Sequence, residues 1–415
     1  MTAQVYDRAD VVIIGAGAAG LMAAIWAGRT KSNRGIMVLD GATKLGAKIL
    51  VSGGGRCNVT HDHVDASAFA GSSRHAINKV LRRFDVPQTI AFFRELGVEL
   101  KTEESGKLFP ATDRAKTVLE ALLTAAQQAN VVIRNPCRIQ MVEKIANGFR
   151  VVGEGDAFET PNVILATGGK SLPKSGSDGH GYAIAQALGH TLTPRVFPAL
   201  VPLILPREHF IRELSGLTVP AALEVRAGNN KKIISFTNST LCTHFGISGP
   251  SVLDISRYYL EAKLEDAQTT LRINWLPQKN TEQLDRELQA LGRTSVSKYL
   301  QQYLPERLGR ALCQQAHVEP TVTGDNLTRA QRLSLARMMT QMPLPITGDR
   351  GYDFAEVTAG GVPLSELYLD RMESRVCPGL YLCGEICDVD GRIGGYNFQW
   401  AWASGYVAGI SAGIN

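Results

Sequence analysis

The first clear hydrophobic pattern in the chain is an uninterrupted apolar run that ends directly in a glycine-rich turn. The run covers residues 11–14 and leads into Gly15-Ala16-Gly17-Ala18-Ala19-Gly20. A short apolar run without alternation predicts a parallel strand that is buried on both faces. Residues 21–28 then predict a helix, and residues 35–39 predict a second strand. This order predicts the first βαβ unit of a Rossmann-like α/β fold.

The glycine spacing in this turn gives each position a physical role. Gly15 permits the tight turn, Gly17 lets the backbone approach a pyrophosphate, and Gly20 lets helix and strand pack closely. The helix over residues 21–28 points its positive end at the phosphates, and Ala18 and Ala19 within the turn are further candidates for cofactor binding. Asp40 ends the second strand, where an acid that binds ribose is expected. The pattern predicts dinucleotide binding; the alternative is an ordinary tight turn.

The next part of the chain alternates helical and strand patterns. Residues 51–60 are predicted to form a glycine-rich loop, because they are too polar for a strand. Residues 78–96 are predicted helical, with a break or a new first turn at Pro87, and Gly189 is expected to end a helix over 179–188. The remaining predictions are a helix over 117–129 and strands over 131–133, 139–142, 149–152 and 162–165.

The pattern of apolar residues and prolines changes twice more along the chain, and these changes predict the domain boundaries. From residue 194 to about 236, prolines punctuate short apolar runs, as is typical of antiparallel β structure. Residues 281–342 are helical: Asn280 and Thr328 are cap residues, and apolar residues recur every four positions over 296–312. We therefore predict a split nucleotide-binding domain over 1–190 and 350–415, a β-rich insertion over 191–280 and 343–349, and a helical insert over 281–342.

Two further strand ends indicate a cofactor larger than a nicotinamide. One is Ala166-Thr167-Gly168-Gly169, and the other is Gly384-Glu385. FAD explains these segments together with the first motif, since residues 166–169 would pass beneath the pyrophosphate. Glu385 or Asp388 would accept hydrogen bonds from ribityl or ribose hydroxyls. Residues 391–395 predict a loop before a closing helix from about Asn397, whose N-terminus would stabilise negative charge on a reduced flavin. The alternative is that Gly394 and Gly395 only form a tight turn.

The polar segment after residue 51 carries further candidates for this site. Gly53, Gly54 and Gly55 allow backbone to lie against the flavin or its phosphates. Arg56 is suited to the pyrophosphate or to an anionic substrate, and Lys48 is a second candidate for that charge. Asn58 can donate and accept at the polar edge of a flavin ring. Cys57 is either a proton donor or redox partner, or a small residue that fits a crowded loop.

Two long strings resemble the signatures of the BaiN-like (YhiN-like) flavoprotein family. They are Ser52-Gly-Gly-Gly-Arg-Cys-Asn-Val-Thr60 and Gly394-Gly-Tyr-Asn-Phe-Gln-Trp-Ala401. Segments 166–169, 243–250 and 356–362 resemble that family as well. The resemblance implies FAD, a two-dinucleotide-binding-domain fold, an inserted β-barrel-like domain with a small helical insert, and reduction by NAD(P)H. Members of the family are linked to reduction of C=C bonds in steroid-type substrates and in ribosomal RNA uridines, and to oxidation of an aminoketone.

The same resemblance suggests where a proton donor lies. The insertion is expected to cover the flavin face, and His244 lies in one of its polar loops. His244 is therefore a candidate donor of a proton to carbon as hydride leaves the flavin; the alternative is a structural histidine in a turn. Tyr396 is the other candidate, or a residue that lies over the ring.

Composition narrows the class of protein. The chain has 415 residues, of which 44% are apolar and 20% are charged, and this composition is typical of a globular protein. The length predicts two or three domains. The net charge of +5 is mild for this size and does not demand an anionic partner. Its seven scattered cysteines suit reduced thiols, and with no predicted membrane segment the expected location is the cytoplasm. Cys57, His61 and His63 lack a second ligand cluster, so no metal site is expected.

These observations predict an FAD-dependent oxidoreductase that takes hydride from NAD(P)H and reduces an activated C=C bond of a small organic substrate. One alternative is a ribosomal RNA uridine reductase, since the helical insert carries several Arg and Lys residues that would suit phosphates or form a solvated charged face. Two others are an amine or aminoketone oxidase and a flavin-binding protein without turnover. The pattern leaves the oligomeric state open.

Overall fold

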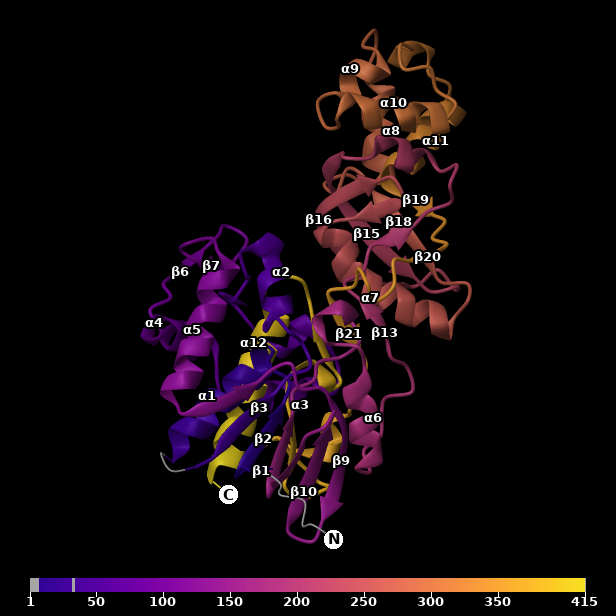
Figure 1. Cartoon of the computed structure of the whole chain (residues 1–415). Coiled ribbons are helices and arrows are strands. Elements are labelled where there is room, and N and C mark those ends of the chain that lie inside the picture. Colours follow the sequence, from indigo (N-terminus) through magenta and orange to yellow (C-terminus); the bar gives the residue numbers. More distant parts are fainter. Residues whose placement is uncertain (1–6, 32–33, 415) are drawn as a thin grey trace. The chain divides into compact units, whose positions relative to one another are not determined.

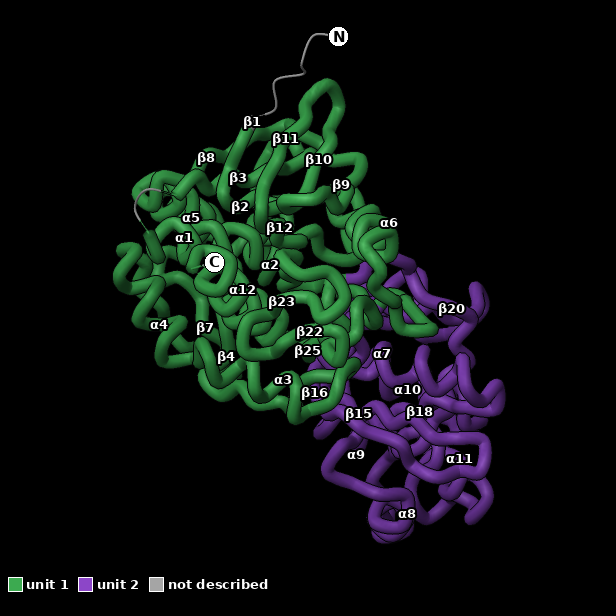
Figure 2. The backbone as a smooth tube through the Cα atoms, turned by 90° about the horizontal axis from the view of Figure 1, so that it is seen from below, with its two compact units in different colours: residues 1–198, 356–415 green, residues 199–355 purple. Residues whose placement is uncertain are grey.

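The computed structural model of the chain describes residues 7–31 and 34–414, which form two compact units. Unit 1 comprises residues 1–198 and 356–415, and unit 2 comprises residues 199–355 (Figure 2). The helical segment 281–342 belongs to unit 2, because its leucines share one hydrophobic core with the β-rich segment. The boundaries thus lie at 198/199 and 355/356, against the 190 and 350 expected, and the two inserted segments form one unit.

The core of unit 1 is a sheet with the strand order β22-β23-β24-β12-β2-β3-β8, of which β2 and β3 are labelled in Figure 1. β24, β12, β2, β3 and β8 are parallel, and β22 and β23 extend the edge in antiparallel fashion. The strands are β2 (Val11–Ile14), β3 (Ile36–Leu39), β8 (Val131–Arg134), β12 (Asn162–Leu165), β22 (Leu367–Tyr368), β23 (Glu373–Ser374) and β24 (Leu380–Leu382). The two parts of the split domain therefore build one sheet, and the predicted Rossmann-like α/β fold is confirmed.

Two helices from opposite ends of the chain, α1 (Ala18–Thr30) and α12 (Tyr396–Ile414), pack against each other. α1 follows the first glycine turn, and α12 closes the chain. A Cβ at Gly405 would lie 2.5 Å from the Ala19 carbonyl oxygen, and one at Gly409 would lie 2.3 Å from that of Ala23. Only glycine permits this approach, so α12 is held against the helix of the first βαβ unit.

The remaining elements of unit 1 differ from the predictions in two places. The predicted helix over 78–96 is two helices, because Asp85 caps a new helix with a capping box to Gln88, and Pro87 lies in its first turn. Residues 51–55 continue a helix, although Ser52, Gly53 and Gly54 leave helical backbone angles. Gly189, at φ +95°, ends its helix in the left-handed conformation as expected. The helices are α2 (Ala47–Gly55), α3 (Arg74–Leu81), α4 (Val86–Glu95), α5 (Ala115–Gln128) and α6 (His180–Ala187), with 3₁₀ turns η1 (Ala66–Ala68), η2 (Pro173–Ser175), η5 (Leu364–Glu366) and η6 (Gly384–Ile386).

Smaller sheets complete unit 1. One has the order β1-β11-β10-β9, one has the order β4-β7-β6, and β25 pairs with β5. Their strands are β1 (Asp7–Arg8), β4 (Thr60–His61), β5 (Phe69–Gly71), β6 (Leu100–Thr102), β7 (Lys107–Pro110), β9 (Ile139–Ile145), β10 (Gly148–Gly153), β11 (Ala157–Thr160) and β25 (Val389–Gly391). At the limits of this unit lie β13 (Phe197–Ala199) and β21 (Val357–Ala359).

Unit 2 is an antiparallel sheet with helices. Its strand order is β19-β18-β15-β16-β17-β14-β20. The strands are β14 (Leu203–Ile204), β15 (Thr218–Arg226), β16 (Lys232–Thr243), β17 (Gly246–Ser248), β18 (Thr270–Asn274), β19 (Met342–Leu344) and β20 (Gly348–Asp349). The helices are α7 (Pro250–Glu265), α8 (Thr281–Gln289), α9 (Val296–Leu300), α10 (Glu306–Gln315) and α11 (Arg329–Thr340), with 3₁₀ turns η3 (Phe210–Leu214) and η4 (Gly324–Asn326).

The two helix caps that the sequence predicts in unit 2 are present in the structure. The apolar stripe over 296–312, however, does not form a single helix. Asn280 and Thr328 each form a capping box, with Gln283 and Gln331 respectively. The stripe over 296–312 is divided between α9 and α10, and Pro305 is the N-cap residue of α10. α7 was not predicted from the sequence, although Pro250 in its first turn is a helix-start signal.

Candidate functional site

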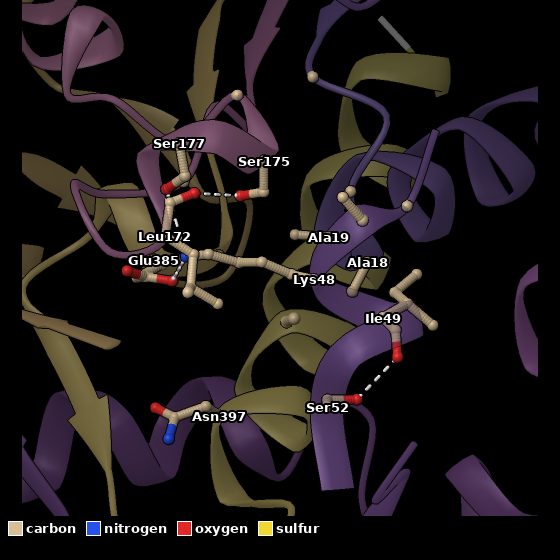
Figure 3. A pocket seen from close by; sticks show the side chains of 18 of the residues that line it. Ala18, Ala19, Lys48, Ile49, Ser52, Leu172, Ser175, Ser177, Glu385 and Asn397 are labelled. Atoms are coloured by element: carbon tan, nitrogen blue, oxygen red, sulfur yellow. Dashed lines mark hydrogen bonds and ion pairs between the residues drawn. The ribbon is translucent and has the colours of Figure 1, made fainter. Parts of the chain in front are cut away.

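A cavity of about 570 Å³ lies in unit 1 at the carboxyl ends of the parallel strands (Figure 3). The residues that follow β2, β3, β12 and β24 line it, together with residues of α2, α6 and β7 and the turn before α12. This is the edge at which open α/β sheets bind their ligands, and the volume lies within the range of about 300–1,000 Å³ that is typical of ligand sites.

The first glycine motif forms one end of the cavity. Gly15 has φ +105°, and a Cβ there would lie 2.4 Å from the Ala166 carbonyl oxygen, so this turn requires glycine. A Cβ at Gly20 would lie 1.9 Å from the Gly15 carbonyl oxygen, which explains the close packing of helix on strand. A Cβ at Gly17 would meet no atom within 4 Å, and Gly17 caps α1 without a side-chain hydrogen bond. Open space beside free amides at a helix N-terminus is what a phosphate group needs.

Asp40 lies next to this motif at the end of β3. Its Oδ2 accepts a hydrogen bond from the Ala16 amide at 2.6 Å, and its Oδ1 accepts one from the Ala42 amide at 2.8 Å. These bonds fix the carboxylate at the cavity wall, and a carboxylate has further lone pairs that can accept from hydroxyls. The arrangement suits the ribose contact that the sequence predicted.

Two of the lining residues, Lys48 and Glu385, form an ion pair. Lys48 Nζ lies 2.7 Å from Glu385 Oε2 and 3.2 Å from Ser177 Oγ (Figure 3). Glu385 Oε1 also accepts a hydrogen bond from the Thr358 amide at 3.0 Å, so the carboxylate is held from two sides. Residues from α2, from η6 after β24 and from the segment after β12 therefore meet at one point.

The glycine-rich C-terminal part of α2 also lines the cavity. Gly53 and Gly54 have φ values of +57° and +69°, and a Cβ at Gly53 would lie 2.9 Å from the Phe109 ring. The Arg56 guanidinium lies 4.0 Å from the centre of that ring and 2.6 Å from a Glu103 oxygen. Arg56 is therefore held by stacking and by an ion pair, with one face still at the cavity.

Two polar atoms at the cavity wall are buried without a hydrogen-bond partner among the described residues. They are Asn58 Oδ1 and Thr167 Oγ1. Asn58 is only 7% exposed, and an unpaired buried carbonyl oxygen costs about 1–3 kcal/mol. Both residues line the cavity, so a bound ligand with hydrogen-bond donors would complete their bonding.

Cys57 does not line this cavity among the residues described. Its side chain is fully buried, and burial raises the pKa of its thiol to about 12. The residue has φ +62°, in the tight segment between Gly53 and Asn58. This placement favours the interpretation of Cys57 as a small residue in a crowded loop over the one in which it is a redox partner.

We expect Cys57→Ala to keep flavin content and turnover within about three-fold, because a buried thiol with so high a pKa does not form the reactive thiolate at neutral pH. Native protein should resist iodoacetamide at pH 8 at this position, as peptide mass spectrometry would show. The native thiol keeps its proton above the ordinary thiol pKa of 9.0, so its contribution to stability is present below pH 9.0 and declines as the pH rises toward about 12. Rapid native labelling, or a large loss of turnover in Cys57→Ala, would contradict this view.

The structure brings most of the predicted cofactor residues together at the cavity. Those that line it are Gly15, Gly17, Ala18, Ala19, Asp40, Lys48, Gly53, Gly54, Arg56, Asn58, Ala166, Thr167, Gly168, Gly384, Glu385, Gly394, Gly395 and Asn397. Gly20, Gly55, Gly169, Asp388 and Tyr396 lie outside the lining, so for these residues the structure shows no direct contact with the cavity. Gly20 and Gly169 are close-packed against neighbouring atoms instead.

Of the two acids that the sequence offered, Glu385 lines the cavity and Asp388 does not. Glu385 faces the cavity, whereas Asp388 is 8% exposed and accepts a hydrogen bond from Ser72 Oγ at 3.2 Å. A Cβ at Gly71 would lie 2.5 Å from the Asp388 carbonyl oxygen, so this segment packs against β5. Three residues of separation place the two carboxylates in different surroundings.

The two candidate proton donors have different environments. Tyr396 is 9% exposed, and its ring stacks on His61 with centroids 4.9 Å apart. His244 lies in unit 2 in the turn between β16 and β17, where it is exposed and its backbone oxygen accepts from Arg212 Nε at 2.6 Å. Its imidazole has no hydrogen bond to any described residue.

Several lining residues were missed from the sequence. They include Lys107, Phe109, Arg138, Asp178 and Arg392. Lys107 and Phe109 are two residues apart on β7 and so share one face of the strand. Residues 107–110 read Lys-Leu-Phe-Pro, which has no polar–apolar alternation, so the sequence carried no signal for the direction of these side chains.

The chain matches one protein family along nearly its whole length. Residues 9–411 match the family described as HI0933-like protein Rossmann domain. This chain belongs to the HI0933-like family. The BaiN-like resemblance seen in the sequence is thereby confirmed, and with it the assignment to flavoprotein oxidoreductases of the Rossmann type.

Relatives within the HI0933-like family carry two different names. The chain is 36% identical to a 3-dehydro-bile acid Δ(4,6)-reductase of Clostridium scindens, over 96% of this chain and 98% of that protein. It is 34% identical to a ribosomal RNA dihydrouridine synthase of Escherichia coli, over 97% of each. It is 33% identical to the ribosomal RNA dihydrouridine synthase of Haemophilus influenzae, over 96% of this chain and 97% of that protein.

Solved structures agree with the fold of the HI0933-like chain. The E. coli quinol fumarate reductase matches with a TM-score of 0.55 at 16% identity, over 99% of this chain and 71% of that one. The 3-ketosteroid Δ1-dehydrogenase of Sterolibacterium denitrificans matches with a TM-score of 0.54 at 13% identity, over 98% and 100%. At these identities the likeness concerns the fold alone.

The described part of the chain shows neither a metal cluster nor a helix that could span a membrane. Residues 7–31 and 34–414 contain no group of three or more His, Cys, Asp and Glu side chains placed to hold a metal ion. Over the same residues, no helix combines the length and the apolar character needed to cross a bilayer.

Proposed function

We propose that the protein binds FAD along the cavity and uses hydride from NAD(P)H to reduce a C=C bond that is conjugated to a carbonyl group in an organic substrate. The observation that carries this proposal is that one cavity is lined by the first glycine motif, the glycine-rich C-terminal part of α2, the ATGG segment and the turn before α12. The 36% identity to a bile acid Δ(4,6)-reductase over nearly the full length supports the reaction type.

The residues of the cavity fit FAD in three ways. Gly17 and Gly54 leave open space at its wall, and a dinucleotide needs close backbone approach. Asp40 and Glu385 are carboxylates at two separated points, each able to accept from sugar or ribityl hydroxyls. The unpaired Asn58 Oδ1 and Thr167 Oγ1 need hydrogen-bond donors. Bound FAD supplies reversible two-electron chemistry, which no amino-acid side chain can provide.

Each group of the chain would then have a role that follows from its position. The amides of the first turn of α1 hold the pyrophosphate, and Asp40 holds a ribose hydroxyl. Lys48 neutralises charge beside Glu385, and Arg56 either faces the pyrophosphate or holds an anionic group of the substrate. His244 delivers a proton to the substrate carbon, since its imidazole is free and imidazole is the side chain best suited to proton transfer near neutral pH.

A second function is favoured by two relatives that are ribosomal RNA dihydrouridine synthases. Uracil, like a 3-oxo steroid, has a C=C bond conjugated to a carbonyl, so one mechanism would serve both substrates. In the helical segment Arg310 pairs with Glu306 and Arg332 pairs with Asp285, both at 2.6 Å. Arg293, Lys298, Arg329 and Arg337 are exposed without an ion-pair partner among the described residues, which leaves cations for RNA phosphates.

Anaerobic spectroscopy tests the leading proposal. We expect the purified yellow protein to be bleached by NADH or NADPH, and its yellow absorbance to return when a 3-oxo-Δ4,6 steroid is added. Flavin that stays oxidised with both donors would exclude the nicotinamide step. Reduced protein that reacts with oxygen and releases peroxide, but ignores the steroid, would indicate an oxidase.

A parallel measurement decides between the two substrate classes. Ribosomal RNA from a strain that lacks this protein would be digested and analysed for dihydrouridine by mass spectrometry. Loss of one dihydrouridine, restored by the wild-type chain, would make RNA the substrate. An unchanged dihydrouridine content together with steroid turnover would support the small organic substrate.

A further inference from the structure

Lys107 differs from Lys48, Arg56 and Arg138, which also line the cavity, in having no counter-ion among the described residues. Lys48 pairs with Glu385 at 2.7 Å, Arg56 with Glu103 at 2.6 Å, and Arg138 with Asp178 at 2.6 Å. The Lys107 ammonium makes no ion pair or side-chain hydrogen bond with any residue that the structure describes. It is half-buried and lines the cavity, so it is a positive charge held beside the ligand space without local neutralisation.

The position of Lys107 follows from strand pairing. β7 pairs with β4, which sets Lys107 opposite His61. Lys107 and Phe109 face the cavity, and Leu108 between them is 3% exposed and packs the other way. The stem of Lys107 lies against the turn before α12, since a Cβ at Gly394 would be 3.6 Å from Lys107 Cε. The side chain is thus anchored at the cavity end near the start of α12.

A second source of positive potential lies at the same place. α12 has 19 residues and begins at Tyr396, with no acidic residue in its first turn. Its N-terminal amides carry the positive end of the helix dipole. Asn397 holds the turn rigid, because its side chain donates to the Gly391 carbonyl at 2.9 Å and accepts from the Gly391 amide at 2.8 Å. A fixed helix terminus and an unpaired ammonium together select a ligand that carries or develops negative charge.

We propose that Lys107 faces the pyrimidine edge of the bound flavin and, with the N-terminus of α12, stabilises the negative charge that this edge gains on reduction. The inference rests on the proposed binding of FAD. Lys107 then makes the cofactor easier to reduce by NAD(P)H, because a cation near the ring favours the reduced form over the oxidised form. It is a positioning charge for the cofactor, and it transfers no proton or electron.

Charge removal at Lys107 tests this inference without a turnover assay. The variants are Lys107→Met and Lys107→Gln, with Lys107→Arg to keep the charge. Lys116→Met is the matched control, because it removes one exposed lysine whose partner is Glu120 in the next helical turn. For each protein the dissociation constants of oxidised and reduced FAD are measured, together with the affinity for sulfite, which forms an adduct at flavin N5 and is favoured by positive charge near the ring.

We expect Lys107→Met and Lys107→Gln to weaken the binding of reduced FAD about ten-fold more than that of oxidised FAD. For a two-electron couple this ratio corresponds to a fall of about 30 mV in the midpoint potential. Sulfite affinity should fall in parallel, while Lys107→Arg and Lys116→Met should resemble the wild type. Equal effects on both redox forms, or none, would overturn the inference.

The outcomes separate this inference from the proposal of FAD binding. A wild-type protein that is colourless and does not take up FAD would overturn FAD binding itself. A yellow wild-type protein whose Lys107 variants keep its potential and sulfite affinity would overturn only the role of Lys107. Loss of affinity for an anionic steroid or RNA, with an unchanged potential, would assign Lys107 to the substrate and also contradict the inference.

Discussion

Gly17→Val should produce a folded protein that no longer retains FAD. Gly17 has φ −79° and ψ −171°, an extended conformation that valine adopts without strain. A Cβ at this position meets no atom within 4 Å, so the new side chain occupies only space that belongs to the ligand. Loss of one or two charge-assisted hydrogen bonds to the pyrophosphate costs about 3 kcal/mol, which is about 100-fold in affinity.

Flavin content and thermal unfolding with and without added FAD measure this effect. The apoprotein should lose at most about 1 kcal/mol, because valine is a poorer helix cap than glycine. Wild-type protein should be stabilised by added FAD, and Gly17→Val should not be. Gly348→Val is a matched control, since it also meets no atom within 4 Å and lies outside the cavity lining. Normal flavin content in Gly17→Val would refute the location of the pyrophosphate at this turn.

His244→Gln should slow reoxidation of the reduced protein by its organic substrate about 100-fold to 1,000-fold, the usual range for loss of a general acid. Reduction by NAD(P)H should stay within about two-fold of wild type, because that half-reaction needs no proton from this side chain. The measurement is stopped-flow absorbance of the two half-reactions.

Tyr396→Phe and His63→Gln complete that experiment. His63 is exposed and pairs with Asp65, so its loss should have no effect. Tyr396 lies outside the cavity lining and stacks on His61, so removal of its hydroxyl should change reoxidation by less than about ten-fold. A large effect of Tyr396→Phe with a small effect of His244→Gln would reverse the assignment of the proton donor.

The sequence alone determined the first βαβ unit and the ends of its strands. Residues 11–14 and 163–165 are apolar without alternation, and both lie in buried parallel strands in the structure. The glycine spacing was equally informative, because the backbone angles and packing distances at Gly15 and Gly20 exclude any side chain. Helix caps at Asn280 and Thr328 are likewise local, since a side-chain oxygen and an amide three residues away decide them.

The tertiary structure alone decided which of the remaining polar side chains reach the cavity. Glu385 and Asp388 were equal candidates in the sequence, and only the path of the chain after β24 directs one to Lys48 and the other to Ser72. Lys107 became a cavity residue through the pairing of β7 with β4, two segments more than 40 residues apart. The direction of a side chain on a short strand depends on the register with a distant partner, and that register is a property of the folded core rather than of the local sequence.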